Sequence, residues 1–310
     1  MIQFESLVLF DLKAQWRLVQ NRDDHEGMIV CDFTNRMRVS YHLFMSKFVT
    51  AFLLLSLLPL SAFAGETDWE MIAPDTRVRL ISSDVVTSDN TTMIGIELDM
   101  PTDMKTYWRI PGETGIPTQV DMGKSTGIGS HKIIWPYPTR EHKGGYLDFV
   151  YHGPTLLPLE LKLTGKQVHL EADIVMGVCS DICVPVQAKF TLPLDFTSPD
   201  RGQGLRLRQA LSLSPIAWME GKEPLGKVSL NKGTGSLDVE YDREIVDPRS
   251  IIVDNGDPTI LFEMPQKGPI PGVVSFLLLD RDQTEGLQDK PISLTFMTSD
   301  GAFELTRIVQ

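Results

Sequence analysis

The chain has 310 residues, and its 29 Lys and Arg against 41 Asp and Glu give a formal net charge of −12 at pH 7. Binding to nucleic acid or to an anionic membrane surface needs clustered basic residues, so this excess of acid argues against both partners. The length allows two domains of roughly 120 residues each once a leader is removed.

The first recognisable element is a signal peptide at residues 45–64. Lys47 gives it a basic start, 48–60 form an apolar core, and Ala62-Phe63-Ala64 places small residues where a signal peptidase cuts. The apolar run is short for a membrane span and contains Pro59, so we expect a cleaved signal rather than a permanent anchor. The sequence therefore predicts an exported protein.

Residues 1–44 precede this signal and carry mixed charges without sustained periodicity. Signal peptides do not normally follow so long a segment. We expect translation to begin at Met45, which makes 1–44 an upstream extension that is not native to the protein. A cytosolic segment ahead of a signal anchor is the alternative.

After the signal, apolar residues recur at every second position, which predicts β-strands. The clearest runs are 94–100, 157–163, 168–176 and 184–194. Such alternation, interrupted by turns rich in Gly, Pro and Asp, is typical of antiparallel strands with one buried face. Short strands at this spacing predict a β-sandwich domain at 65–196.

The alternation stops at 197–224, where loop-like residues surround a short helical pattern at 205–212. This segment is predicted to be a linker with a short helix. Strand patterns then resume and include a hairpin turn at Ser299-Asp300-Gly301. We expect a second, smaller β-sandwich at 225–310, so the predicted fold class is all-β with two antiparallel sandwich domains. The second domain has no cysteine or histidine, which favours a supporting or docking role.

Cys179 and Cys183 are the only cysteines after the signal peptide. The two alternating runs that contain them are joined by three residues, and such a hairpin-like connection brings its flanking Cα atoms close to disulfide distance. Ser180 and Asp181 make the connection polar, and Pro185 stiffens its exit and lacks a backbone donor.

Three uses of this pair remain open from its spacing. A disulfide that closes so short a loop contributes roughly 2 kcal/mol as a structural clip. Bridges at exposed tips are often exchangeable, which favours a redox-active dithiol. Two thiolates with Met176 nearby in sequence also suit Cu(I), whereas the histidines show no spacing that completes a zinc site.

The chain resembles a known family around this pair. The resemblance rests on Lys105-Thr106-Tyr107-Trp108-Arg109-Ile110-Pro111-Gly112 with Gly115-Ile116-Pro117, on Trp135-Pro136-Tyr137-Pro138 with Gly144-Gly145-Tyr146, and on Gly177-Val178-Cys179-Ser180-Asp181-Ile182-Cys183-Val184-Pro185. Over roughly 70–195 these residues are similar to the N-terminal, immunoglobulin-like periplasmic domain of the DsbD and ScsB thiol:disulfide interchange proteins. The three-residue spacing of the cysteines is the ScsB-like form.

The resemblance implies a periplasmic electron shuttle that needs no cofactor beyond its redox-active disulfide. A membrane-embedded donor of the DsbD or CcdA type would reduce it, and it would reduce periplasmic thioredoxin-fold proteins, in settings such as cytochrome c biogenesis or copper tolerance. Cys183 would form the mixed disulfide and Cys179 would resolve it. Tyr146 would cap the pair, and Tyr107 and Trp108 either line the same pocket or belong to the core.

Members of this family continue into a transmembrane conduit, whereas this sequence ends at Gln310. We therefore expect a free-standing thiol:disulfide oxidoreductase module of the protein-disulfide reductase type, with its donor on a separate membrane protein. The alternative is a non-catalytic periplasmic binding protein in which the pair is a structural disulfide or a Cu(I) site.

Overall fold

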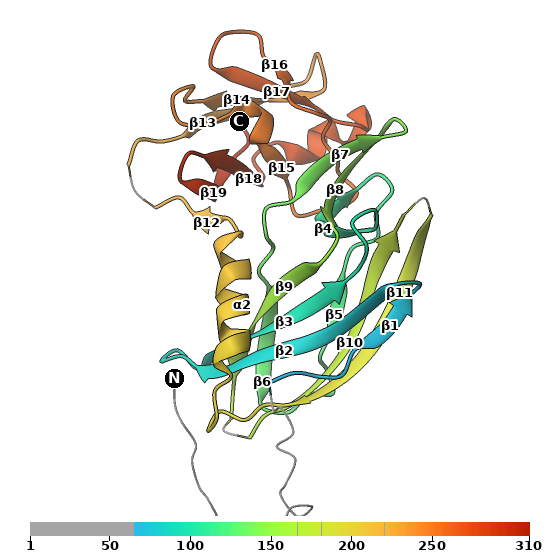
Figure 1. Cartoon of the computed structure of the whole chain (residues 1–310). Coiled ribbons are helices and arrows are strands. Elements are labelled where there is room, and N and C mark those ends of the chain that lie inside the picture. The colour runs from blue at the N-terminus through green and yellow to red at the C-terminus, as the bar shows by residue number, and fades with distance from the viewer. Residues whose placement is uncertain (1–64, 166, 181, 220) are drawn as a thin grey trace, which may run out of the picture. The chain divides into compact units, whose positions relative to one another are not determined.

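The structure is a computed structural model that describes residues 65–310 except 166, 181 and 220 (Figure 1). The predicted extension at 1–44 and the predicted signal peptide at 45–64 lie outside the described residues. The described part belongs to one compact unit, Ser61–Gln310. None of its helices is long and apolar enough to cross a membrane.

The first part of the described chain forms two antiparallel sheets (Figure 1). One sheet contains, in spatial order, β1 (Glu70–Ala73), β2 (Thr76–Val86), β3 (Thr91–Asp99), β9 (Thr155–Leu163) and β6 (Ile128–Ile133). The other contains β11 (Cys183–Pro193), β10 (His169–Cys179), β4 (Lys105–Gly112), β8 (Tyr146–His152) and β7 (Thr139–Lys143), with β5 (Gln119–Asp121) paired to β10.

The core of this first sandwich follows the alternation in the sequence. Every second residue is buried from 92 to 98 in β3 and from 157 to 163 in β9, including Ile94, Ile96, Leu157 and Leu159. Complete burial of such an aliphatic side chain contributes about 1.5–3 kcal/mol. The period of two therefore both defines the strands and supplies the apolar area that holds the two sheets together.

The C-terminal part forms a second pair of four-stranded sheets with a core of its own. One contains β13 (Leu225–Asn231), β14 (Ser236–Tyr241), β17 (Val273–Leu277) and β16 (Gln266–Lys267). The other contains β12 (Ile216–Ala217), β19 (Gly301–Ile308), β18 (Pro291–Thr298) and β15 (Ile252–Asp254). Two 3-10 helices, η1 (Pro248–Ser250) and η2 (Arg281–Leu287), lie in the connections. The predicted hairpin turn lies between β18 and β19, as expected.

The helix α2 (Arg201–Ser212) starts four residues earlier than the predicted helical pattern. Asp200 caps it, since its side chain accepts a hydrogen bond from the backbone N–H of Gln203. Leu207 is buried against β3 at Gly95, where a Cβ atom would come within 2.8 Å of the Leu207 Cδ2. The helix therefore packs on the first sandwich (Figure 1), and the segment predicted as a linker is in part a packed element. The division at 196 and 225 remains a prediction.

Asp84 of β2 is a buried acid near the start of this helix, with 1% of its surface exposed. Its Oδ1 lies 2.8 Å from the Ser82 hydroxyl, which donates to it, whereas its buried Oδ2 has no hydrogen bond of normal geometry within the described residues. Burial raises the pKa of Asp84 to about 6, and the nearby carboxylates of Asp195 and Asp200 add to the rise. No described cation forms an ion pair with it.

Candidate redox site

The two cysteines lie at the end of a long, regular hairpin. Strands β10 and β11 pair without interruption from His169 opposite Pro193 to Cys179 opposite Cys183. This register places the cysteine Cα atoms 4.2 Å apart, and a disulfide joins them. The alternation that predicted the strands therefore also set the cysteines face to face. Of the predicted connection, Asp181 lies outside the described residues.

The tip of this hairpin is exposed, but its two sulfurs are not equally so. Cys179 is fully buried and Cys183 is only partly buried. Around Cys183 the side chains of Ile182 (76% exposed) and Val184 face solvent, and Ser180 and Pro185 are exposed as well. A protein that approaches the tip therefore meets Cys183 before Cys179.

Tyr107 of β4 contacts both sulfurs from the buried side of the disulfide. Its hydroxyl oxygen lies 2.9 Å from the Sγ of Cys179 and 2.9 Å from the Sγ of Cys183. Disulfide sulfurs can only accept, so the hydroxyl donates its single proton between them. Burial raises the pKa of Tyr107, which keeps the hydroxyl protonated and able to donate. Together with Val150, this ring covers the buried side of the pair.

Tyr107 and Trp108 do not line one pocket, because successive residues of a strand point to opposite faces of the sheet. Trp108 lies in the large core between the sheets, where its ring centroid is 5.8 Å from that of Phe149. Of the two alternatives that the sequence left open, contact with the disulfide applies to Tyr107 and a place in the core applies to Trp108.

A buried lysine lies next to this aromatic contact. Lys105 pairs with Cys179 across the β4–β10 ladder and is only 8% exposed. Its ammonium group forms ion pairs with Glu141 of β7 and with Asp148 of β8, at 3.2 Å from the Asp148 Oδ2. It also lies 5.7 Å from the centroid of the Tyr107 ring. Burial lowers the pKa of Lys105, but the bonds to the two carboxylates outweigh it and leave that pKa above its ordinary value.

The carboxylates of this cluster have further partners. Asp148, 4% exposed, accepts hydrogen bonds from the backbone N–H of Thr114 at 3.0 Å and from its hydroxyl at 2.6 Å. The Glu141 Oε1 lies 3.3 Å from the Nε2 of His152. We refer to Lys105, Glu141, Asp148 and His152 as the charged cluster. Its lysine lies on β4, the strand next to Cys179, and is paired there with two carboxylates.

No sequence motif predicted the charged cluster, although one signal was present. Asp148 interrupts an apolar run between Leu147 and Phe149, and Lys105 lies at the start of a strand pattern. A charged residue is rarely buried unless it is paired. The pairs join residues 36 and 43 positions apart, so only the strand order reveals them.

Tyr146, the predicted cap residue, lies at the β7–β8 hairpin (Figure 1). The turn is formed by Gly144 and Gly145, both with positive φ, which suits a two-residue hairpin loop. The Tyr146 side chain is 53% exposed and makes no hydrogen bond or ring contact with another described residue. Its role as a cap remains a prediction.

Strand β4, which carries Tyr107, also contacts the C-terminal sandwich. Arg109, two residues beyond Tyr107 on β4, lies 2.6 Å from Asp254 of β15 and also pairs with Glu304 of β19. Its guanidinium stacks 4.3 Å from the centroid of the Trp108 ring. Lys105, Tyr107 and Arg109 thus occupy alternate positions of β4. Lys105 belongs to the charged cluster, Tyr107 contacts the two sulfurs, and Arg109 pairs with residues of the second sandwich.

Comparison with known proteins identifies the class of domain that carries this site. Residues 71–195 match the family described as thiol:disulfide interchange protein DsbD, N-terminal. The resemblance expected from the sequence is therefore confirmed for this segment, which contains the hairpin, Tyr107 and the charged cluster. At this general level, the match and the disulfide support thiol:disulfide interchange.

One solved structure sharpens the comparison. The crystal structure of the N-terminal periplasmic domain of ScsB from Proteus mirabilis has a TM-score of 0.61 and 18% sequence identity to this chain. The likeness covers 79% of this chain and 98% of that one. At this identity the likeness establishes the fold, and it confirms the predicted all-β class of immunoglobulin-like antiparallel sandwiches. No curated protein sequence matches the chain.

Proposed function

We propose that the protein is a periplasmic thiol:disulfide interchange protein in which Cys179 and Cys183 pass electrons to thioredoxin-fold partners. One observation carries the proposal. The disulfide lies at an exposed hairpin tip with one sulfur buried, the other accessible, and a buried hydroxyl 2.9 Å from both. A clip over so short a loop adds only about 2 kcal/mol, whereas this arrangement suits exchange.

The reaction consists of two exchanges. In the reduced protein, the Cys183 thiolate attacks a partner disulfide, a mixed disulfide forms, and one partner sulfur leaves as a thiolate. The Cys179 thiolate then attacks the Cys183 Sγ, which closes the internal disulfide and releases the second partner thiolate. Two electrons move to the partner, and the two protons of the original thiols end on the partner's thiols. The greater exposure of Cys183 supports its role as the attacking thiol.

The groups beneath the pair are suited to this chemistry. The Tyr107 hydroxyl donates a hydrogen bond to whichever sulfur carries negative charge, and such charge-assisted bonds are stronger than neutral ones. The Lys105 cation lies on the neighbouring strand, where ion pairs with Glu141 and Asp148 hold it in place. The Tyr107 hydroxyl is therefore the group placed to stabilise a thiolate at either sulfur.

The proposal extends to the partners. A membrane-embedded donor of the DsbD or CcdA type would return the pair to the dithiol form, and periplasmic thioredoxin-fold proteins would accept its electrons. The exposed apolar side chains of Ile182 and Val184 flank Cys183 and offer contact area for these proteins. The Tyr146 ring would cover the dithiol between encounters.

A trapping experiment tests the order of the two cysteines. The Cys179→Ser variant, incubated with an oxidised thioredoxin-fold protein, is expected to hold it as a mixed disulfide through Cys183 in non-reducing mass analysis. The matched Cys183→Ser variant should trap far less, because Cys179 is buried. Equal trapping by both variants would refute the order. Loss of the folded state in Cys179→Ser would instead indicate a structural disulfide.

A further inference from the structure

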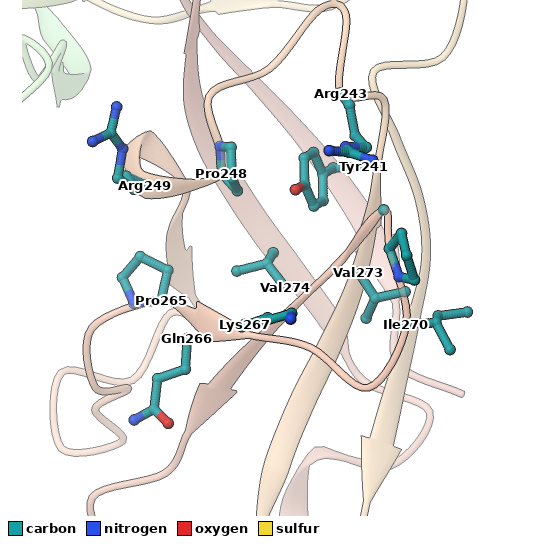
Figure 2. Close-up of a pocket in the computed structure, with 12 residues that line it drawn as sticks. Tyr241, Arg243, Pro248, Arg249, Pro265, Gln266, Lys267, Ile270, Val273 and Val274 are labelled. Atoms are coloured by element: carbon teal, nitrogen blue, oxygen red, sulfur yellow. The ribbon is translucent and has the colours of Figure 1, made fainter.

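The C-terminal sandwich contains a cavity of about 430 Å³ that is separate from the cysteines (Figure 2). It opens at the end of the β14–β17–β16 sheet, where Tyr241 ends β14 and donates its backbone N–H to the Gly272 carbonyl. Val274 of β17 forms part of its floor. The volume lies within the range of about 300–1,000 Å³ typical of sites for small organic ligands.

The walls of this cavity are stiff before any ligand binds. Three of the lining residues are prolines, namely Pro248, Pro265 and Pro271. Proline fixes its own φ, so these walls lose little conformational freedom when a ligand becomes ordered against them. Gly272, with a φ of 86°, provides the backbone turn that returns the chain into β17. The cavity is therefore a preformed apolar site.

The charges around the cavity are all of one sign. Arg243, Arg249 and Lys267 line it, and none of the lining residues is acidic. Arg249 is already paired with Asp247, at 3.0 Å, and Figure 2 shows its guanidinium turned away from the other lining side chains. The side chains of Arg243 and Lys267, which both line the cavity, form no ion pair or hydrogen bond with another described residue. An acidic protein therefore keeps two uncompensated cations at the edge of an apolar cavity.

The floor offers one more polar group. The Tyr241 ring packs against the core of the C-terminal sandwich, and its hydroxyl has no hydrogen-bond partner among the described residues. A donor at the floor, two cations at the rim and apolar walls match a ligand that has an apolar body and an anionic head. A purely apolar ligand would form no ion pair with Arg243 or Lys267.

We propose that this cavity binds a small organic anion whose apolar body lies against the prolines and Tyr241 and whose acidic group pairs with Arg243 and Lys267. The C-terminal sandwich is then a ligand-binding module. This function is independent of the cysteine pair and goes beyond thiol:disulfide interchange.

A pair of fluorescent probes tests the proposal on the purified protein. Anilinonaphthalene sulfonate has an aromatic body with an anionic sulfonate, and N-phenyl-1-naphthylamine has nearly the same body without a charge. We expect saturable binding of the sulfonate at one site per chain. Arg243→Ala and Lys267→Ala should each weaken it about 3-fold, and the double variant about 10-fold, as expected for exposed charge pairs.

The controls separate this site from general adsorption. Lys232→Ala removes an exposed lysine from the turn between β13 and β14, outside the cavity, and should leave sulfonate binding unchanged. The uncharged probe should bind equally to the original protein and to the double variant. Sulfonate binding that is absent, not saturable, or unaffected by the double substitution would overturn the proposal. So would an equal loss of both probes, because the cations would then not select for the anion.

Discussion

Two regions of the first sandwich bury charged side chains, and they differ in how the charge is compensated. In the charged cluster, Lys105 is held by two carboxylates, and Asp148 has further hydrogen bonds from Thr114. Beside α2, Asp84 is buried with a serine hydroxyl as its partner and with other carboxylates nearby. The two carboxylates hold the pKa of Lys105 above its ordinary value, so the ammonium keeps its charge, whereas burial raises the pKa of Asp84 to about 6.

The two regions differ in how the burial of charge affects stability. Burying the charged cluster costs desolvation that its ion pairs offset, so the cluster gives little net stability. The uncompensated Asp84 lowers stability near neutral pH and has no redox group near it in the structure's described part. Substitutions at Lys105, Asp84 and Tyr107 test this difference, in order of decreasing expected effect.

The largest effect is expected from Lys105→Met, which leaves Glu141 and Asp148 without their cation. Removing one partner of a buried ion pair typically costs about 3–5 kcal/mol, so the free energy of unfolding of the oxidised protein should fall by about that amount. Urea denaturation measures it. The double variant Lys105→Met/Asp148→Asn, which removes one charge of each sign, should recover part of the loss. A double variant as unstable as the single one would show that packing, and not charge compensation, is lost.

Asp84→Asn is expected to change the free energy of unfolding by a smaller amount and to raise it rather than lower it. The folded-state pKa of about 6 lies above the ordinary value, so the original protein loses stability as pH rises from about 4 to about 6. The substitution removes this loss. It should raise the free energy of unfolding by about 1–2 kcal/mol at pH 7, less than the full rise in pKa implies, because an amide is buried in its place.

Thermal unfolding at pH 4 and pH 7 checks this second prediction. Asparagine also tolerates the positive φ of residue 84, so the backbone need not change. The variant should differ from the original at pH 7 and match it closely at pH 4. An equal difference at both values would mean that the carboxylate does not titrate in this range.

The smallest effect is expected from Tyr107→Phe, which removes the hydroxyl between the sulfurs and keeps the ring. The thiolate of the reduced form loses a hydrogen bond of about 1 kcal/mol, so the reduction potential should become about 20 mV more negative. Tyr151→Phe is the matched control, because that buried hydroxyl donates to the Pro136 carbonyl. An equal shift of the reduction potential in Tyr151→Phe would contradict a specific effect of the Tyr107 hydroxyl on the sulfurs.

The fold and the cysteine pair follow from local sequence features. Alternation in 168–176 and 184–194 predicts both strands of the hairpin, and the three residues between Cys179 and Cys183 fix their register. The segments that carry the family resemblance include the hairpin and Tyr107. These features depend on residues close together in the chain, where period and spacing are informative.

The rest of the site depends on strand order, which no local pattern contains. The ion pairs of Lys105 require that β8 and β7 follow β4 in the sheet, and the choice between Tyr107 and Trp108 requires knowing which face of β4 meets the hairpin. The helix start was missed because Asp200, its N-cap, lies in a segment that resembles a loop. The cavity of the second sandwich joins 241–249 to 265–274, two proline-containing segments whose proximity only the structure shows.

The reduction potential of the Cys179–Cys183 pair tests the central claim most directly. It is measured by equilibration of the purified protein in thiol redox buffers, followed by thiol trapping and mass analysis. A value within the range of thioredoxin-like proteins, about −270 to −120 mV, is the result that electron transfer through this pair requires. A value well below about −300 mV would mark the disulfide as structural and contradict the proposed function.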